Sequence, residues 1–196
     1  IRGRSFLRKS DLKTGRIDKQ VSVGRSLFSE GVTVFHHRLY QLYWISGFGD
    51  IRNTSNLKRV GRFSIKSQGW GLTHNQRDLI MSNGSSRLLF LDPNDGFKVV
   101  KKLKVHTVWG EVNNLNALLY KDHIIYANIW FADVIAMISD TTGRVKGWID
   151  LSALYPGRKK YRPHCAVANG IAFDNLTQHL IVTGKCWKHL YEIALP

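Results

Sequence analysis

The chain has 196 residues, a length that suits one domain at roughly 100–200 residues per domain. Apolar residues make up 43% of it and aromatic residues 11%, which excludes a disordered tail, and two cysteines are too few for a disulfide-stapled mini-domain or a zinc site of four cysteines. Lys and Arg number 29 against 14 Asp and Glu, and the net charge of +15 favours anionic partners.

Short apolar or alternating segments recur between Gly, Asn and Asp residues, and helical periodicity is nearly absent. The first segments predict a hairpin over Ser5–Val23 with a turn at Lys13–Arg16, and further turns are expected at Pro93–Gly96 and Thr141–Arg144. The other strands are predicted, in chain order, at Val32–Phe35, Leu39–Trp44, Leu57–Ile65, Leu79–Ser82, Leu88–Asp92, Lys98–Val105, Ile124–Ile129, Val134–Ser139, Val145–Leu151, Leu180–Thr183 and Leu190–Ala194.

The longest apolar stretch, Ile124–Ile138, contains Asn128 and Asp133 and is shorter than the ~18 residues that a membrane span needs. We therefore expect no membrane span. No signal peptide opens the chain, which begins with Ile1 rather than Met, so a processed or truncated start is expected.

The turns reveal a repeat, because "SDLKTGRIDKQVSV", "LDPNDGFKVVKKLKV" and "ISDTTGRVKGWIDL" each read as strand, turn and strand. Each follows two further strands, and the period of roughly 40–55 residues is typical of four-stranded propeller blades. Complete blades are predicted to begin near Gly31, Gly71 and Leu115, and a three-stranded remnant near Gly170. The N-terminal hairpin supplies only the outer part of another blade, so either the ring is incomplete or the sequence lacks its beginning. A β-sandwich with coincidental hairpins is the alternative.

Polar and aromatic residues recur where blades begin and where loops reach the central channel. Indoles exclude water, a carboxylate can take a proton from an amine, and amide or ammonium donors can stabilise an oxyanion. Each residue also has a structural explanation: core packing for the tryptophans, turn capping for the asparagines, and a solvated charge for the others. The candidates are Glu30, Trp44, Trp70, Asn116, Trp130, Asn169 and Lys185.

Other chemistries have little support, since the chain has no HExxH, GxSxG or phosphate-binding glycine loop. The only close histidine pair is His36-His37, and as neighbours on a strand these would face opposite sides and be poor ligands for one metal. We expect no metal and no cofactor. Cys165 and Cys186 could pair, or each could be a small buried residue. Three glycosylation sequons give slight support to a secretory route: Asn53-Thr54-Ser55, Asn83-Gly84-Ser85 and Asn175-Leu176-Thr177.

Taken together, six stretches resemble the plant-type and bacterial glutaminyl-peptide cyclotransferases, also called glutamine cyclotransferases. They are "GRSFLRKSDLKTGRI", "SEGVTVFHHRLYQLYW", "GWGLTHNQRDLIMSNGSSRLLFLDP", "LNALLYKDHIIYANIWFADVIAMI", "TGRVKGWIDL" and "NGIAFDNLTQHLIVTGKCWKHLYEI". They occur in family order over nearly all of the chain, which makes the resemblance specific.

The resemblance implies a five-bladed β-propeller, here one domain over residues 1–196 whose first blade lacks its N-terminal strands. It also implies an aminoacyltransferase that converts N-terminal glutaminyl residues to pyroglutamate and releases ammonia, without zinc. The implied substrates are peptides or proteins with N-terminal Gln, and the implied protein is a monomer of the secretory or extracellular space.

The family motifs also imply roles for the candidate residues. Glu30 would bind the amine and accept its proton, Asn116 would bind the carboxamide or oxyanion, and Lys185 would polarise the carboxamide or assist the leaving group. The residues implied to bind the substrate are Trp44, Trp70, Trp130 and Asn169.

The sequence departs from the family pattern at several positions. The family's "LNELE" reads "LNALL", with Ala117 and Leu119 in place of glutamates, "SDG" reads "SNG" at Asn83, and Lys188 replaces a proline. The family's opening "FTQGL" and "ESTG" strands are absent.

Three functions therefore stay open. The first is an active cyclotransferase, and the second is a catalytically impaired relic or binding module of the same family. The third is a basic propeller that binds polyanions. Because the basic residues are spread, without runs of about five or six like charges, and no nucleic-acid-binding fold signature occurs, we expect no specific nucleic-acid site.

Overall fold

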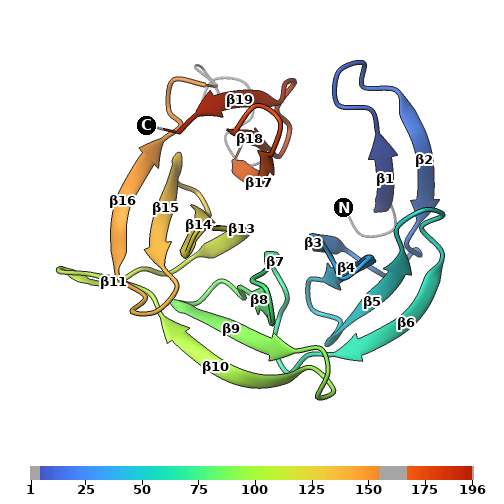
Figure 1. The fold of residues 1–196 in the computed structure, drawn as a ribbon, viewed down its shortest axis with the longest axis horizontal. Helices are drawn as coiled ribbons and strands as arrows, with labels where there is room; N and C mark the ends of the chain where they lie inside the picture. The colour runs from blue at the N-terminus through green and yellow to red at the C-terminus, as the bar shows by residue number, and fades with distance from the viewer. Residues whose placement is uncertain (1–4, 155–166, 196) are drawn as a thin grey trace.

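The computed structural model describes residues 5–154 and 167–195, and every helix or strand assigned among them is a β-strand. Four antiparallel sheets follow one another around a central space, as the blades of a propeller do (Figure 1). We call these sheets blades I to IV in chain order. The predicted all-β, propeller-like fold is therefore confirmed with four blades, and the fifth blade stays a prediction. No described segment is a helix long and apolar enough to cross a membrane.

Blades I to III each have four strands in the described chain, and blade IV has three. Blade I contains β3 (Ser29–Phe35), β4 (Arg38–Tyr43), β5 (Phe48–Asn53) and β6 (Arg59–Ser64). Blade II contains β7 (Leu72–His74), β8 (Leu79–Met81), β9 (Arg87–Asp92) and β10 (Lys98–Lys104). Blade III contains β13 (Leu115–Lys121), β14 (Ile124–Ile129), β15 (Val134–Ser139) and β16 (Val145–Asp150). Blade IV contains β17 (Ala168–Asp174), β18 (His179–Gly184) and β19 (Tyr191–Ala194).

Two hairpins lie outside the four blades. The predicted N-terminal hairpin pairs β1 (Phe6–Ser10) with β2 (Ile17–Ser22) and lies beside blade I in the ring (Figure 1). A second hairpin pairs β11 (His106–Thr107) with β12 (Gly110–Glu111) between blades II and III. The sequence did not predict this second hairpin, because strands of two residues are too short to show an alternating pattern.

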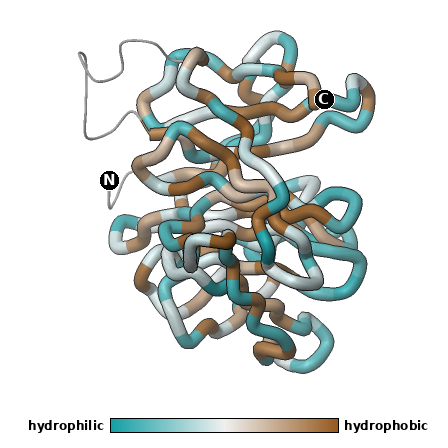
Figure 2. The backbone as a smooth tube through the Cα atoms, turned by 90° about the vertical axis from the view of Figure 1, so that its left-hand side faces the viewer, coloured by the Kyte–Doolittle hydropathy of each residue, from teal (hydrophilic) through white to brown (hydrophobic). Residues whose placement is uncertain are grey.

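The hydrophobic core consists of layers between neighbouring blades. In β8, Leu79 and Met81 pack against blade I, while Ile80 between them packs toward blade III. Successive side chains of a strand point to opposite faces, so a central strand with apolar residues at every position serves two layers at once. Figure 2 shows brown, hydrophobic stretches through the middle of the molecule and many teal loops at its margins.

Two local predictions were wrong, both because of turns. His36 and His37 do not lie on a strand: they form the β3–β4 turn, with φ of 45° and 59°. Two-residue hairpin turns with positive φ match the right-handed twist of the flanking strands. The strand predicted from Leu57 begins at Arg59, because Leu57 has a φ of 60° in the preceding turn.

Strand β5 is missing from the predicted strands because its buried side chains are polar. Asp50 and Arg52 are buried and form an ion pair, with Arg52 Nη2 at 3.0 Å from Asp50 Oδ2. The paired charges satisfy each other inside the sheet, which lets a strand form without the apolar alternation used to find it.

Candidate functional site

The innermost strands of three blades carry a β-bulge at the same place, and three of the predicted site residues lie inside these bulges. The residues are Glu30 in blade I, Asn116 in blade III and Asn169 in blade IV. A bulge breaks the strand pairing and redirects a side chain, so equivalent bulges in neighbouring blades direct different functional groups to one region. The pairing shifts fall between Ser29 and Val32, Leu115 and Leu118, and Ala168 and Ile171.

Three further predicted residues occupy a second repeated position, just after the second strand of a blade. There, a backbone N–H donates to the carbonyl two residues before the bulge residue. The pairs are Trp44 to Phe28 at 3.0 Å, Trp130 to Asn114 at 2.9 Å, and Lys185 to Val167 at 2.8 Å. Each blade of this kind therefore contributes one side chain from its first strand and one from the end of its second.

In blade II the corresponding wall residue is Trp70, which lies two residues before β7. Its carbonyl accepts a 2.7 Å hydrogen bond from the Gly31 N–H of blade I. Two glycines permit this close approach: a Cβ on Gly31 would lie 2.6 Å from the Leu72 nitrogen, and one on Gly71 only 1.9 Å from the Asn116 carbonyl oxygen. The inner strands can approach this closely only because these two positions have no side chain.

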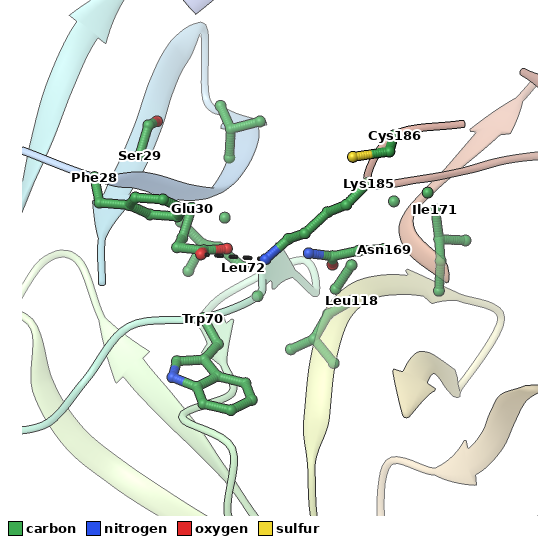
Figure 3. A pocket seen from close by; sticks show the side chains of 16 residues that line it. Phe28, Ser29, Glu30, Trp70, Leu72, Leu118, Asn169, Ile171, Lys185 and Cys186 are labelled. Atoms are coloured by element: carbon green, nitrogen blue, oxygen red, sulfur yellow. Dashed lines mark ion pairs between the residues drawn. The ribbon is translucent and has the colours of Figure 1, made fainter. Parts of the chain in front are cut away.

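All seven predicted site residues line one of two adjoining cavities at the centre of the ring. The smaller cavity, of about 150 Å³, is lined by Phe28, Glu30, Trp44, Trp70, Asn116, Trp130 and Lys185. The larger, of about 690 Å³, shares Phe28, Glu30, Trp70 and Lys185 with it and also contacts Asn169. Figure 3 shows Lys185 reaching across the larger cavity toward Glu30, with Asn169 beside its amine.

Glu30 and Lys185 form an ion pair where the two cavities meet. Lys185 Nζ lies 3.7 Å from Glu30 Oε1, and the Glu30 side chain is only 13% exposed. Burial raises the pKa of the Glu30 carboxyl above its usual value, and the nearby Lys185 charge partly opposes that rise. A buried carboxylate with a raised pKa is a suitable proton acceptor for an amine.

The walls of the smaller cavity are aromatic and packed edge to face. The rings of Trp70 and Trp130 are 5.1 Å apart at 88°, and those of Phe28 and Trp44 are 6.0 Å apart at 65°. Both contacts have the geometry that aromatic quadrupoles favour. Because the three indoles line a cavity, simple core packing does not account for their placement.

A single glutamine orients two of these indoles. The Gln68 Oε1 atom accepts a hydrogen bond from Trp44 Nε1 and another from Trp70 Nε1, both of 2.9 Å. Indole N–H groups only donate, so both bonds require the oxygen of the Gln68 amide to face them. Gln68 thereby links the wall residue of blade I to that of blade II.

Sequence reasoning missed Gln68 and Phe28 for different reasons. Phe28 lies two positions before Glu30, but it precedes β3 and Glu30 lies in a bulge, so strand alternation does not predict that the two side chains share a cavity. Gln68 lies in an irregular segment, where its bond to Trp44 depends on the spatial meeting of two blades. No sequence pattern indicates that bond.

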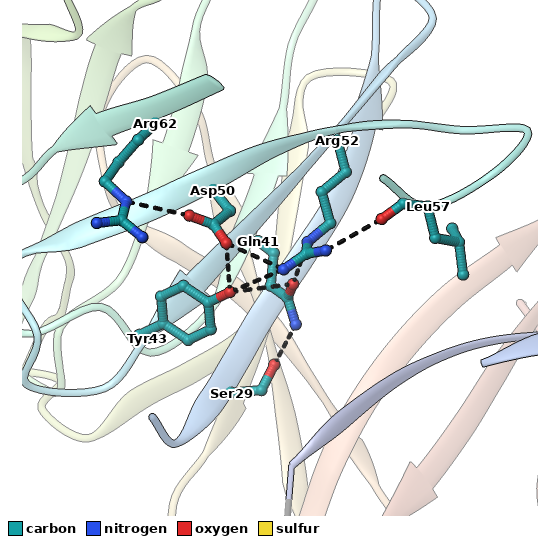
Figure 4. Close-up of polar contacts among 7 residues, drawn as sticks. All are labelled: Ser29, Gln41, Tyr43, Asp50, Arg52, Leu57 and Arg62. Carbon is teal, nitrogen blue, oxygen red and sulfur yellow. Dashed lines mark hydrogen bonds and ion pairs between the residues drawn. The ribbon is translucent and has the colours of Figure 1, made fainter. Parts of the chain in front are cut away.

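A buried polar network supports the strand that carries Glu30 (Figure 4). Gln41 Nε2 donates to Ser29 Oγ at 2.5 Å, while Gln41 Oε1 accepts from Arg52 Nε at 2.9 Å. Asp50 Oδ2 accepts from Tyr43 OH at 2.8 Å and also contacts Arg52. The network thus joins the residue next to Glu30 to the charged pair inside blade I.

The described residues contain no group of three or more His, Cys, Asp or Glu side chains placed to hold a metal ion. Cys186 lines the larger cavity. The possible pairing of Cys186 with Cys165 is not tested, because Cys165 lies outside the described residues, and the alternative of a small buried residue is wrong for Cys186, which is exposed.

Comparison with known proteins gives consistent matches over the whole chain. The glutamine cyclotransferase family model matches residues 1–195. A glutaminyl-peptide cyclotransferase of Arabidopsis thaliana is 39% identical over 195 residues, covering 98% of this chain, but the match spans only 61% of that relative's length.

The structural matches agree with this. The crystal structure of Myxococcus xanthus glutaminyl cyclase superimposes with a TM-score of 0.89 at 32% identity, over 96% of this chain and 81% of that one. The WD40 β-propeller domain of Doa1 matches with a TM-score of 0.51 at 12% identity, over 88% of this chain and 53% of that one, and supports the fold alone. The chain therefore belongs to the glutamine cyclotransferase family.

Proposed function

We propose that this chain catalyses, or forms the catalytic part of a protein that catalyses, conversion of an N-terminal glutaminyl residue to pyroglutamate with release of ammonia. The observation that carries the proposal is the Glu30–Lys185 pair at the junction of two cavities, one of them walled by three indoles. The expected substrates are peptides or proteins that begin with Gln. The smaller cavity suits the reacting residue, and the larger one has room for the chain that follows it.

The reaction needs one proton acceptor and a fixed ring-closing geometry. Glu30 takes a proton from the α-ammonium group, and the neutral amine then attacks the side-chain Cδ. A new C–N bond forms, and the carbonyl electron pair moves to oxygen, where Asn116 and Lys185 stabilise the oxyanion. Glu30 gives its proton to the leaving nitrogen and takes one from the new ring nitrogen. The carbonyl re-forms as the Cδ–N bond to the leaving group breaks, and Glu30 returns the remaining proton to the departing ammonia.

The aromatic walls contribute by excluding water and by contacting the substrate cation. Trp44, Trp70 and Trp130 line the cavity that Glu30 shares, and an indole face attracts an ammonium group. Asn169, which lies beside Lys185, would hold the backbone of the substrate. Because the proposed steps move protons through Glu30, we expect a metal chelator to leave turnover unchanged.

The Glu30→Gln variant tests the proposal directly. It keeps the size of the side chain but removes the proton acceptor, so ammonia release from a glutaminyl dipeptide should fall by at least about 100-fold. The control is Glu192→Gln, which removes a carboxylate that pairs with His179 on an exposed surface of blade IV. Retained turnover in folded Glu30→Gln protein would contradict the assignment, and the Arabidopsis relative serves as the positive control for the assay.

One observation favours the second function left open by the sequence, a binding module without turnover. Ala117 lines the larger cavity at the position where the family resemblance places a glutamate. Folded protein that binds a glutaminyl peptide but releases no ammonia, and that gains turnover in Ala117→Glu, would favour this module.

We also propose a fifth blade, to which β1 and β2 would contribute the outer strands. The position of this hairpin in the ring, between blade IV and blade I, supports the idea (Figure 1). A monomeric state and a secretory route are part of the same proposal. Light scattering of purified protein tests the first, and glycosidase treatment of protein made in a secreting host tests the second.

A further inference from the structure

The hairpin between blades II and III presents two apolar side chains to solvent at its tip. Because Thr107 pairs with Gly110, the residues between them, Val108 and Trp109, form the two-residue loop. Val108 is 73% exposed and Trp109 is 90% exposed. The hairpin projects outward from the rim of the ring in Figure 1, away from the central site. Neither residue therefore contributes to the core or to the proposed active site.

A second exposed tryptophan lies beside the tip. The hairpin and the start of β16 enclose a hollow of about 200 Å³ that contacts both Trp109 and Trp148. Its remaining lining residues are Thr107, Val108, Arg144, Val145, Lys146 and Gly147. None of these eight residues is acidic. The hollow is thus apolar and cationic.

The two tip residues carry no charge, and two cations, Arg144 and Lys146, line the hollow beside them. The backbone of Arg144 forms an isolated parallel β-bridge with that of His106, the first residue of β11. Glu111, the acidic residue of the hairpin, is neutralised by Lys104, whose Nζ lies 2.6 Å from Glu111 Oε1. The tip is therefore uncharged, and Arg144 and Lys146 meet no acidic residue in the lining of the hollow. We call Val108, Trp109, Arg144, Lys146 and Trp148 the rim patch.

We propose that the rim patch docks on an anionic lipid surface, with Val108 and Trp109 entering the headgroup region. Tryptophan is favoured at membrane–water interfaces, and Lys or Arg side chains near the surface are attracted to anionic headgroups. An apolar tip with cationic side chains beside it matches the surface of an anionic bilayer, where apolar chains adjoin charged headgroups. A single-stranded nucleic acid would stack on the indole rings, but the aliphatic Val108 side chain, 73% exposed at the tip, would add nothing to such a site, whereas a bilayer takes up both tip residues. The net charge of +15 supports attraction to the same surface.

Vesicle co-sedimentation of the whole chain tests the proposal without depending on turnover. We expect binding to vesicles of phosphatidylcholine mixed with phosphatidylserine, and little binding to phosphatidylcholine alone. The double variant Val108→Ser, Trp109→Ser should lower the partition coefficient by about tenfold or more. Leu176→Ser is the matched control, because Leu176 is 94% exposed at another loop and its loss should leave binding unchanged.

The charge contribution is tested by Lys146→Glu against Lys58→Glu, which makes the same change in net charge on blade I. Only Lys146→Glu should weaken the preference for phosphatidylserine by severalfold. Circular dichroism confirms that each variant folds. Equal vesicle binding by the unaltered chain and the tip variant would overturn the proposal. So would a tip variant that loses binding to single-stranded DNA but not to vesicles, since the patch would then serve nucleic acid.

Discussion

The Glu30 carboxyl has two opposing influences on its ionisation, and together they predict the pH dependence of turnover. Burial raises its pKa, and Lys185 lowers it in part. Since the proposed reaction needs ionised Glu30, kcat/KM should fall as the pH drops through the raised pKa, above the range of an exposed glutamate. Lys185→Met removes the lowering influence, so the acid limb of the profile should move to higher pH. An acid limb that stays in place, or moves to lower pH, would separate Lys185 from Glu30 ionisation.

Gln68 is expected to act on the reaction through the two indoles that it orients. Gln68→Met removes the acceptor of both Trp44 and Trp70, and a lost hydrogen bond of about 1 kcal/mol for each predicts a fall in kcat/KM of roughly 5- to 30-fold. Gln68→Glu keeps an acceptor and should restore much of the activity. The indole N–H resonances of both tryptophans should shift in Gln68→Met, while that of Trp148 should not. Unshifted resonances would show that Gln68 does not hold the indoles.

At this scale the sequence could select candidate residues that meet in the structure, because the fold repeats. Glu30, Asn116 and Asn169 occupy one position of the repeat, so aligning the blades also aligns the groups that meet at the centre. Gln68 could not be found in the same way. The Gln68 side-chain oxygen accepts hydrogen bonds from Trp44 of blade I and from Trp70 at the start of blade II. Comparing the repeats reveals features that all blades share, and this contact occurs at one junction between two blades.

Gly71 shows how closely the blades must pack at the channel. A Cβ at this position would lie 1.9 Å from the Asn116 carbonyl oxygen, and the backbone of blade III cannot yield as a flexible side chain could. Gly71→Ala should therefore lower the free energy of unfolding by about 2–3 kcal/mol, the cost of forcing an extra methyl group into a packed site. Gly61→Ala is the control, because its Cβ would contact Ile51 at an ordinary 3.4 Å or more. Urea unfolding of both variants provides the comparison, and equal stabilities would contradict this account.

Strands that consist of apolar runs were predicted from the sequence, and β5, whose buried side chains are polar, was not. The middle strands β8 and β14 have runs of apolar residues, because both of their faces are covered by neighbouring blades. Strand β5 escaped detection because Asp50, only 2% exposed, and Arg52 satisfy each other within blade I. Alternation places Asp50 and Arg52 on one face of β5, but their burial depends on hydrogen bonds with Tyr43 and Gln41 of the neighbouring strand β4, which the sequence of β5 does not show.

The whole molecule is a series of layers, so its ends should be less stable than its middle. Blade III packs against blade II on one face and blade IV on the other, which buries most of β14 on both sides. The β1–β2 hairpin instead packs on blade I through a small cluster that includes Leu7 and Val23, and most of its other residues are exposed. Local opening costs less free energy where fewer apolar contacts are lost. Amides of β1 and β2 should therefore exchange with deuterium roughly 100-fold faster or more than those of β14, as measured by mass spectrometry on peptides of the chain. Equal protection of the hairpin and β14 would mean that the molecule unfolds as one cooperative unit, and that stability does not follow the order of the layers.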